Sequence, residues 1–292
     1  MQVTGVPATN MGQFDKVITD FLHAHNVPGA AVAVARNGSV IIARGYGLLD
    51  KDDAGSAVNP ANIYRIASVS KPITAVAILK LIQDGRLKMT SRVYTLLKSS
   101  YPLLSGKSLT PGIEKITVQH LLRHEGGWDR DSTNYDPMFD SVQIASAVGV
   151  TPPASAGDII RHMWSQPLQF QPGTKSVYSN FGYCLLGRVI ERVTGRPYGE
   201  YVQNEIFGPM GITGIVLGRS RMSGQHWVKR PTPMRRSPHR SSRPMVRSRL
   251  RTAGSASRRW TPMAAGWPPP SVWWSLSAPW RTTPCSARRR SP

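Results

Sequence analysis

The chain has 292 residues, long enough for one large domain or two smaller ones, and carries a formal net charge of +21. That charge is unevenly spread: residues 1–205 hold 20 lysines and arginines and all 16 carboxylates, whereas residues 206–292 hold 17 lysines and arginines and no carboxylate. Two cysteines, Cys184 and Cys285, exclude a disulfide framework, and the lack of a C-x-x-C pair excludes a zinc site of that type.

The N-terminal residues and the hydropathy pattern indicate where the protein resides. Met1–Thr4 contains no basic segment followed by an apolar run, so the sequence predicts no signal peptide. No stretch reaches the roughly 18 apolar residues that a membrane-spanning helix needs. We therefore expect a cytoplasmic protein without a membrane span from the sequence as it stands, and a periplasmic or secreted one if the N-terminus is incomplete.

The first predicted elements are a helix and a β-hairpin. Apolar residues at helical spacing predict an amphipathic helix, and they are Phe14, Val17, Ile18, Phe21 and Leu22. The small apolar run 29–35 and the run 39–46 flank Asn37-Gly38, a pair typical of two-residue hairpin turns.

A second helix is predicted from about Ser68 to Asp84-Gly85, where the glycine suits a left-handed cap. The residues expected to form its buried stripe are Val69, Ile73, Val76, Leu79 and Ile82.

Short helices and loops are expected over residues 86–200. Thr117 is a candidate helix cap, and residues 182–193 predict a further helix closed by Gly195. No later segment predicts the extra strands that a two-stranded sheet needs for independent stability.

The first candidate catalytic residues form an S-x-x-K motif, Ser68-Val69-Ser70-Lys71. Ser68 stands where a helix begins, so neighbouring amides and the helix dipole face any developing negative charge. Lys71 lies one turn further on the same face, and a lysine with a lowered pKa can help take the proton of a serine hydroxyl. The alternative is that Ser68 only caps the helix and that Lys71 is solvated.

A second polar motif, Tyr178-Ser179-Asn180, lies between a predicted turn at Gln171–Thr174 and the helix over 182–193. The cation of a nearby lysine favours a phenolate, which would make Tyr178 a general base. Asn180 offers an amide that can bind a substrate carbonyl and steady Lys71. The alternative is a buried tyrosine followed by an ordinary turn asparagine.

These motifs and several others occur in the order and spacing of one known family. The landmarks are Pro28–Val34, Arg44–Gly47, Tyr64–Pro72, His120–His124, Pro172–Thr174, Tyr178–Tyr183 and Leu185–Gly187. Over about residues 10–217 the chain resembles the serine hydrolases of the class C β-lactamase and D-alanyl-D-alanine carboxypeptidase family, which includes penicillin-binding-protein-like and esterase-type members.

The resemblance implies an α+β fold of the β-lactamase/transpeptidase type, with an antiparallel sheet flanked by helices and a mainly helical region. It implies that Ser68 forms an acyl-enzyme while Lys71 and Tyr178 move the proton, that the Ser68 backbone N–H is half of an oxyanion hole, and that Asn180 binds substrate. The expected substrate is a small ester, peptide or β-lactam, and the oligomeric state cannot be read from the sequence.

Two histidines have the spacing of metal ligands. His120 and His124 stand four residues apart, but no third ligand follows nearby, and the H-E-x-x-H pattern fails at Trp128. The resemblance places His124 in a structural turn with Gly126 and Gly127. We expect neither a metal nor another cofactor, and Trp128 either lines the rim of a cleft or simply packs.

The third motif of the family, Lys or His followed by Thr or Ser and Gly, does not occur after residue 205. In the family it lies on an inner strand that flanks the nucleophile and supplies the second oxyanion amide. We therefore expect a fold that lacks its C-terminal strands and an impaired or inactive hydrolase.

The composition changes after Leu217. Residues 218–292 contain no Ile, Phe, Tyr, Asn, Asp or Glu, but hold six of the eight tryptophans and eleven of the 24 prolines. Such a segment is expected to be disordered. When its gene is read one frame over, ordinary helical and glycine-rich sequence can emerge, so we hypothesise a frameshift near residues 217–222.

The basic tail leaves one alternative function open. A non-catalytic relative could bind nucleic acid or anionic surfaces by neutralising phosphates with arginine and stacking with tryptophan. The tail contains no zinc finger, heptad or RNP-like pattern, so no specific nucleic-acid partner is expected.

Overall fold

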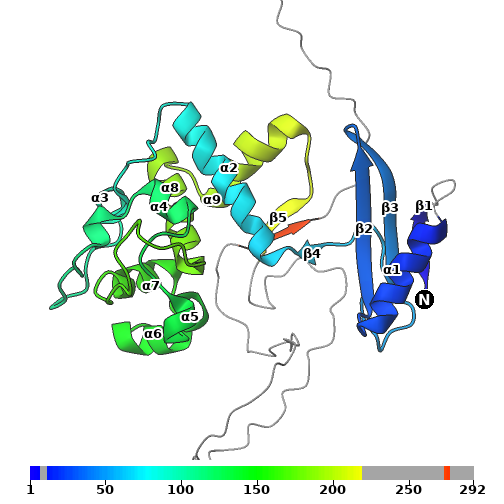
Figure 1. Cartoon of the computed structure of the whole chain (residues 1–292), viewed down its shortest axis with the longest axis horizontal. Coiled ribbons are helices and arrows are strands. Elements are labelled where there is room, and N and C mark those ends of the chain that lie inside the picture. Colours follow the sequence, from blue (N-terminus) through cyan, green and yellow to red (C-terminus); the bar gives the residue numbers. More distant parts are fainter. Residues whose placement is uncertain (7–11, 219–272, 277–292) are drawn as a thin grey trace, which may run out of the picture.

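The computed structural model describes residues 1–6, 12–218 and 273–276. Over these residues the chain is α+β: an antiparallel sheet carries one helix, and a mainly helical region that begins with a long helix follows (Figure 1). This is the predicted fold class. None of the helices in the described part of the chain is long and apolar enough to cross a membrane.

The elements follow one another along the chain with these bounds. The strands are β1 Val3–Val6, β2 Gly29–Arg36, β3 Ser39–Gly47, β4 Tyr64–Arg65, β5 Ile215–Gly218 and β6 Trp273–Leu276. The α-helices are α1 Gly12–Ala24, α2 Ser70–Gln83, α3 Val93–Leu97, α4 Val118–Leu122, α5 Arg130–Thr133, α6 Ser141–Val148, α7 Ala156–Met163, α8 Asn180–Thr194 and α9 Tyr198–Val202. Short 3₁₀ turns cover Ala67–Val69, Ile113–Lys115, Pro137–Phe139 and Gly208–Met210, and a π-turn covers Gln203–Phe207.

The N-terminal sheet has three antiparallel strands in the order β1-β3-β2. Its β2–β3 hairpin confirms the predicted one, and Asn37 and Gly38 in the turn have φ of 50° and 76°, which these two residue types adopt at low cost. Strand β1 is not predicted from the sequence because its four residues, Val-Thr-Gly-Val, form a short run with a glycine inside.

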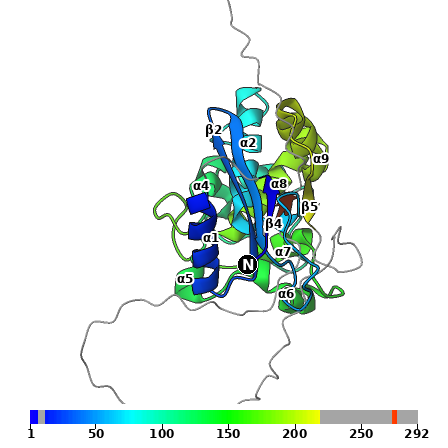
Figure 2. The ribbon, with the colours of Figure 1, turned by 90° about the vertical axis from the view of Figure 1, so that its right-hand side faces the viewer.

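Helix α1 confirms the first predicted helix and lies against this sheet (Figures 1 and 2). Asp15 of α1 accepts a hydrogen bond from the Tyr46 hydroxyl at 2.7 Å and pairs with Arg44 at 2.8 Å. Burial, together with the bond to Asp15, raises the pKa of Tyr46 to about 12. Not all of the predicted apolar face is covered, since Val17 and Phe21 are 65% and 56% exposed.

Helix α2 begins after the 3₁₀ turn Ala67–Val69 and is followed by Gly85 with φ of 72°, close to the predicted limits. The predicted buried stripe is wrong in part, because Val69, Val76 and Leu79 are exposed. α2 carries apolar residues around most of its circumference, so spacing alone does not decide which side packs against α8. The residues that α2 buries are Ser70, Thr74, Ala77, Ile78 and Leu81.

The main hydrophobic core lies in the helical region around α8, which contacts α2, α3, α4 and α9. Gly195, with φ of 72°, caps α8 as predicted. Thr117 accepts the His120 backbone N–H and so confirms the predicted cap of α4. Among the largest side chains buried here are Trp164, Tyr198, Phe181, Ile78, Leu81 and Leu121.

A second sheet joins strands from three distant parts of the chain in the order β4-β6-β5 and lies beside the start of α2 (Figure 1). The expectation that no segment after the helix over 182–193 adds a strand is therefore wrong for Ile215–Gly218 and Trp273–Leu276. The Trp-Trp-Ser-Leu sequence of β6 favours a strand, but the lack of periodicity over the whole tail hides so short an element. The rest of the tail, with the expected disorder and the hypothesised frameshift, lies outside the described residues.

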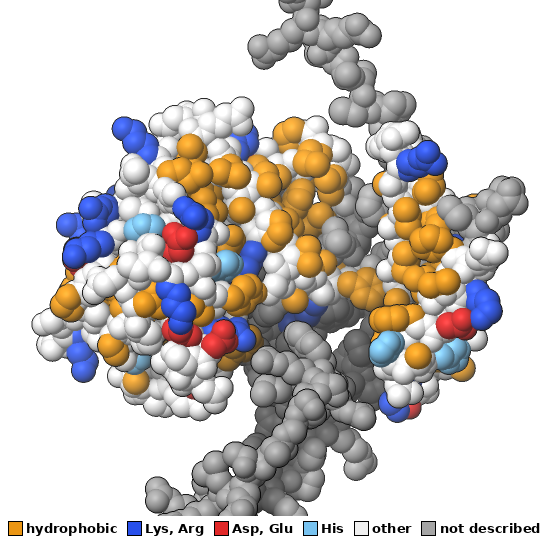
Figure 3. Space-filling view, viewed as in Figure 1, with side chains coloured by type: hydrophobic (Ala, Val, Ile, Leu, Met, Phe, Trp, Pro, Cys, Tyr) orange, Lys and Arg blue, Asp and Glu red, His pale blue; other side chains and the backbone are white. Residues whose placement is uncertain are grey.

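Exposed hydrophobic side chains gather on the surface of both the sheet and the helical region (Figure 3). They include Val69 in the turn before α2, Val76 and Leu79 of α2, and Phe14, Val17 and Phe21 of α1. In this fold class further strands extend the sheet, and the described part of the chain adds only β6 after Gly218.

Candidate active site

Ser68 lies in the 3₁₀ turn that leads into α2, at the surface of the molecule. The residue before it, Ala67, has φ of 45°, in the left-handed region that costs a residue with a side chain roughly 1–2 kcal/mol. Backbone strain of this kind clusters at functional sites, where the surrounding structure holds it. Lys71 follows one turn later, and its Nζ lies 3.2 Å from Ser68 Oγ.

The ammonium group of Lys71 has three oxygen acceptors around it. Besides Ser68 Oγ, it donates to Tyr178 Oη at 2.5 Å and to Asn180 Oδ1 at 2.7 Å. An ammonium has three N–H donors, so this geometry satisfies all of them. Lys71 is therefore held in place by hydrogen bonds and is not the solvated side chain of the alternative interpretation.

Tyr178 completes a closed set of contacts with Ser68 and Lys71. Its hydroxyl lies 2.5 Å from Ser68 Oγ, and Lys71 Nζ lies 4.5 Å from the centre of its ring. Tyr178 is 38% exposed, so it is not the buried tyrosine of the alternative interpretation. The structure thus brings the four residues predicted from the sequence together: Ser68, Lys71, Tyr178 and Asn180.

The loop that carries Tyr178 is held by the start of α8. Ser179 caps this helix, since its Oγ accepts the Gly182 backbone N–H at 3.0 Å, and Asn180 is the first helical residue. Because Tyr178 and Asn180 flank the cap residue, their side chains reach Lys71 from the end of a rigid element rather than from a free loop.

Two residues near the site are not predicted from the sequence, Asp136 and Arg130. Asn180 Nδ2 donates to Asp136 Oδ2 at 2.7 Å, which turns the amide oxygen of Asn180 toward Lys71. Arg130 Nη1 lies 3.2 Å from the same carboxylate oxygen, and its guanidinium is 5.6 Å from the Tyr178 ring centre. No spacing rule points to them, because Asp136 lies 44 residues before Asn180.

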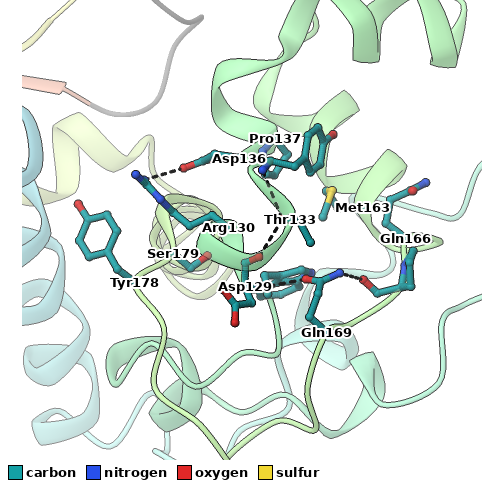
Figure 4. Close-up of a pocket in the computed structure, with 13 residues that line it drawn as sticks. Asp129, Arg130, Thr133, Asp136, Pro137, Met163, Gln166, Gln169, Tyr178 and Ser179 are labelled. Atoms are coloured by element: carbon teal, nitrogen blue, oxygen red, sulfur yellow. Dashed lines mark hydrogen bonds and ion pairs between the residues drawn. The ribbon is translucent and has the colours of Figure 1, made fainter. Parts of the chain in front are cut away.

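A pocket adjoins Tyr178 and encloses about 130 Å³ (Figure 4). Arg130 and Asp136 lie on the side nearest Tyr178, whereas Gln166 and Gln169 lie at the opposite end. Trp128 both lines the pocket and packs, with its ring edge-on to Phe181. Apolar side chains in the wall include Tyr135, Pro137, Met163 and Pro167.

His120 and His124 have separate structural tasks. His120 Nδ1 accepts the Thr117 backbone N–H in a capping box, whereas His124 Nδ1 accepts the Ser179 backbone N–H at 3.1 Å. Burial lowers the pKa of both, and the Lys71 charge adds to the effect at His124. Within the described residues, no group of three or more His, Cys, Asp or Glu side chains is placed to hold a metal ion.

These histidines predict how stability changes with pH. Burial also lowers the pKa of His162, so each of the three has a folded-state pKa below its ordinary value of about 6.5. The folded state then binds fewer protons than the unfolded state, and stability present above pH ~6.5 is lost as the pH falls below it. We expect a lower urea midpoint at pH 5.5 than at pH 7.5, and a smaller difference in His162→Gln. Equal midpoints would contradict this.

Comparison with known proteins identifies the family. The Beta-lactamase family model matches residues 14–267, which is most of the chain. The match extends beyond the landmark motifs, which end before Leu217. The chain belongs to the Beta-lactamase family, as the resemblance predicts. Proteins similar to it include one named an esterase and one described as a penicillin-binding protein homologue.

The chain covers only about half, or less, of the length of each relative that it matches. The chain is 30% identical over 214 residues to Protein flp of Staphylococcus aureus (strain N315), covering 73% of this chain and 40% of that protein. It is 30% identical over 208 residues to Esterase EstB of Burkholderia gladioli, covering 70% and 51%. A solved octameric penicillin-binding protein homologue from Pyrococcus abyssi aligns with a TM-score of 0.55 and 26% identity, over 76% of this chain and 51% of that one.

Proposed function

We propose that this chain is a serine acyl-hydrolase domain that forms an acyl-enzyme on Ser68 from an ester, amide or β-lactam. The observation that carries the proposal is the set of contacts that joins the Ser68 hydroxyl to Tyr178 and Lys71. A serine hydroxyl needs a base within hydrogen-bond reach before it attacks a carbonyl, and both candidates lie within that reach.

In the proposed first step, Ser68 Oγ attacks the substrate carbonyl while its proton passes to Tyr178 Oη. Lys71 remains an ammonium and donates to the same phenol oxygen, so the phenolate that accepts the proton is stabilised before the attack. The tetrahedral intermediate then expels the alcohol or amine, which takes the proton from Tyr178. Deacylation reverses this sequence: water gives a proton to Tyr178 and attacks the acyl carbon. The tetrahedral intermediate then expels Ser68 Oγ, which takes that proton back from Tyr178 as the acid is released.

We further propose that turnover is impaired in this chain. The backbone N–H of Ser68 would supply one oxyanion donor, but the triplet that carries the second donor in the family does not occur after residue 205. Loss of one such donor costs about 10²–10³ in rate in other serine hydrolases. Acylation of Ser68 is therefore the step to measure first, because a slow acyl transfer can be followed as a single turnover.

Active-site labelling tests this proposal. We expect a fluorophosphonate probe to label the full-length protein at pH 8 and to leave Ser68→Ala unlabelled, because the probe bonds to an activated serine oxygen. Circular dichroism of both proteins establishes that they are equally folded. If the folded wild type stays unlabelled, or if Ser68→Ala is labelled equally, the proposal is wrong.

The size of the pocket beside Tyr178 favours a substrate with a compact group at the reacting carbonyl. Its volume of about 130 Å³ is close to that of an engineered cavity of about 150 Å³ that binds benzene. Apolar walls with a few polar groups are typical of small-molecule sites. EstB, which is named an esterase, is a relative, so esters are the natural first substrates.

An ester series tests the size of the group. We expect p-nitrophenyl acetate and butyrate to acylate Ser68 at least about 10-fold faster than the dodecanoate, since the pocket cannot enclose a long chain. Release of p-nitrophenol in a single turnover measures the rate, and Ser68→Ala measures the background hydrolysis. A faster reaction with the dodecanoate would contradict the assignment of the pocket.

The charge distribution supports a second candidate function. Residues 206–292 carry 17 lysines and arginines and no carboxylate, which favours binding to phosphates through charge alone. In that case DNA binding would weaken steeply with salt and disappear on deletion of 218–292, while Ser68→Ala would bind as the wild type does. Labelling of Ser68 and this binding can be measured independently.

A further inference from the structure

His124 contacts the Tyr178 loop in three ways. Its backbone carbonyl accepts the Val177 N–H at 2.9 Å, and its Nδ1 accepts the Ser179 N–H at 3.1 Å. Its ring lies beside the Tyr178 ring, with the centres 4.9 Å apart. The residues on both sides of Tyr178 are therefore fixed by one histidine, and the tyrosine ring itself rests against it.

The contacts around His124 extend to the neighbouring residues. The Gly173 N–H donates to the Glu125 carbonyl at 2.9 Å, and Ser176 Oγ donates to the Arg123 carbonyl at 2.8 Å. Residues 123–125 thus hold the segment from 173 to 179 along its length. Only His124 adds a side-chain bond at the point where the loop enters α8.

The backbone of His124 is itself unusual, with φ of 61°. This conformation costs any residue other than glycine some free energy, although histidine is, with asparagine and aspartate, among the non-glycine types that adopt it most often. A glycine would relieve the backbone cost but would leave the Ser179 N–H without its acceptor. The histidine side chain therefore supplies an acceptor that glycine could not.

We propose that His124 is a positioning residue for the reaction: its unprotonated Nδ1, by accepting the Ser179 N–H, sets the Tyr178 hydroxyl within reach of Ser68. The inference rests on the proposed function, in which Tyr178 accepts the Ser68 proton. It assigns His124 no contact with substrate. It also requires one tautomer, with the proton on Nε2, because a protonated Nδ1 cannot accept a hydrogen bond.

The surroundings of His124 favour the neutral ring. Lys71 on α2 acts on it as a cation, and the rings of Tyr178 and Tyr183 both lie beside it, with the Tyr183 ring centre 5.0 Å away. The adjacent charges of Arg123 and Glu125 pair with each other at 3.2 Å. Burial, aided by the Lys71 charge, lowers the pKa of His124, so the ring is neutral at neutral pH and its Nδ1 stays available.

Two substitutions at His124 test the role of its hydrogen-bond acceptor separately from the role of its backbone conformation. Both His124→Asn and His124→Gly tolerate the positive φ, but only asparagine offers an oxygen near the place of Nδ1. We expect the maximal rate of fluorophosphonate labelling of the full-length chain to stay within about 3-fold of wild type in His124→Asn. In His124→Gly it should fall about 100-fold, the scale of a misplaced catalytic group, with little change in probe affinity.

The pH profile gives a readout that a purely structural role would not produce. We expect the wild-type labelling rate to fall on the acid side in part because His124 gains a proton, and His124→Asn, whose amide does not titrate, to keep only the part that the proposed base contributes. Equal rates in His124→Asn and His124→Gly, or an unchanged acid limb in His124→Asn, would overturn the inference.

A spectroscopic test remains even if the wild type is not labelled, an outcome that would contradict the proposed function alone. The ¹⁵N shifts of the His124 ring should show an unprotonated Nδ1 and a protonated Nε2 at pH 7.5. The Ser179 amide shift should follow the titration of this ring. A proton on Nδ1 at that pH, or a Ser179 amide that ignores the titration, would overturn the role of His124.

Discussion

Replacing Tyr178 by phenylalanine should lower the rate of Ser68 acylation by about 10²–10⁴, the range for loss of a general base. The substitution removes only the hydroxyl, which lies 2.5 Å from both Ser68 Oγ and Lys71 Nζ. The ring stays beside His124, so the fold and the urea midpoint should not change. The rate of p-nitrophenol release in a single turnover measures the effect.

Tyr183→Phe is the matched control for this experiment. The Tyr183 ring also lies beside His124, with the ring centres 5.0 Å apart, but its hydroxyl donates to the Leu122 carbonyl at 3.2 Å and not to Ser68. We expect this variant to acylate Ser68 within about 3-fold of wild type, because no acid–base group is removed. If Tyr178→Phe is no slower than Tyr183→Phe, then Tyr178 is not the base and Lys71 alone must take the proton.

Replacing Lys71 by methionine is expected to cost at least about 10³ in the acylation rate. Methionine keeps much of the length of the side chain but removes the charge and all three hydrogen bonds, to Ser68, Tyr178 and Asn180. Stability should stay the same or rise slightly, since functional sites commonly hold charges at a cost to the fold. Labelling rates and urea midpoints measure the two effects separately.

Lys80→Met provides the control on the same helix. Lys80 pairs with Asp84 at the exposed end of α2 and makes no contact with the site. Because the pair is exposed, its loss should change stability little and leave acylation unchanged. Comparable acylation rates in Lys71→Met and Lys80→Met would exclude an electrostatic role for Lys71.

The four residues of the candidate site could be predicted because the resembled family places them in short, ordered motifs. Ser68 and Lys71 share one helical turn, and Tyr178 and Asn180 flank one cap residue, so local sequence determines how each pair is presented. The contact between the two pairs is a tertiary feature across about 110 residues, and the resemblance alone predicted it.

The supporting residues could not be predicted, for a physical reason. Asp136 acts only because Asn180 folds against it, and Arg130 depends in turn on Asp136. His124 was expected in a structural turn, but the sequence does not reveal that Nδ1 accepts the Ser179 N–H. Such contacts depend on side-chain direction in the folded chain, which neither spacing nor residue type records.

In the fold, too, features set by neighbouring residues could be predicted, whereas features set by residues far apart in the sequence could not. The hairpin and the helix ends follow from residues such as Asn37, Gly38 and Gly195, whose backbone preferences are strong. The buried face of α2 was predicted wrongly in part because several of its sides are apolar. The short strand β6 is paired with distant strands on both edges, so no local pattern reveals it.

The most direct test of the account is to trap the acyl-enzyme and locate it. The full-length protein would be mixed with p-nitrophenyl acetate, quenched in acid, digested with trypsin and analysed by mass spectrometry. We predict one acetyl group on the peptide Ile66–Lys80, which stays intact because trypsin does not cut before Pro72, and none on that peptide in Ser68→Ala. A folded wild type that carries no acetyl group there, or an equal adduct in Ser68→Ala, would contradict the assignment of Ser68 as the nucleophile.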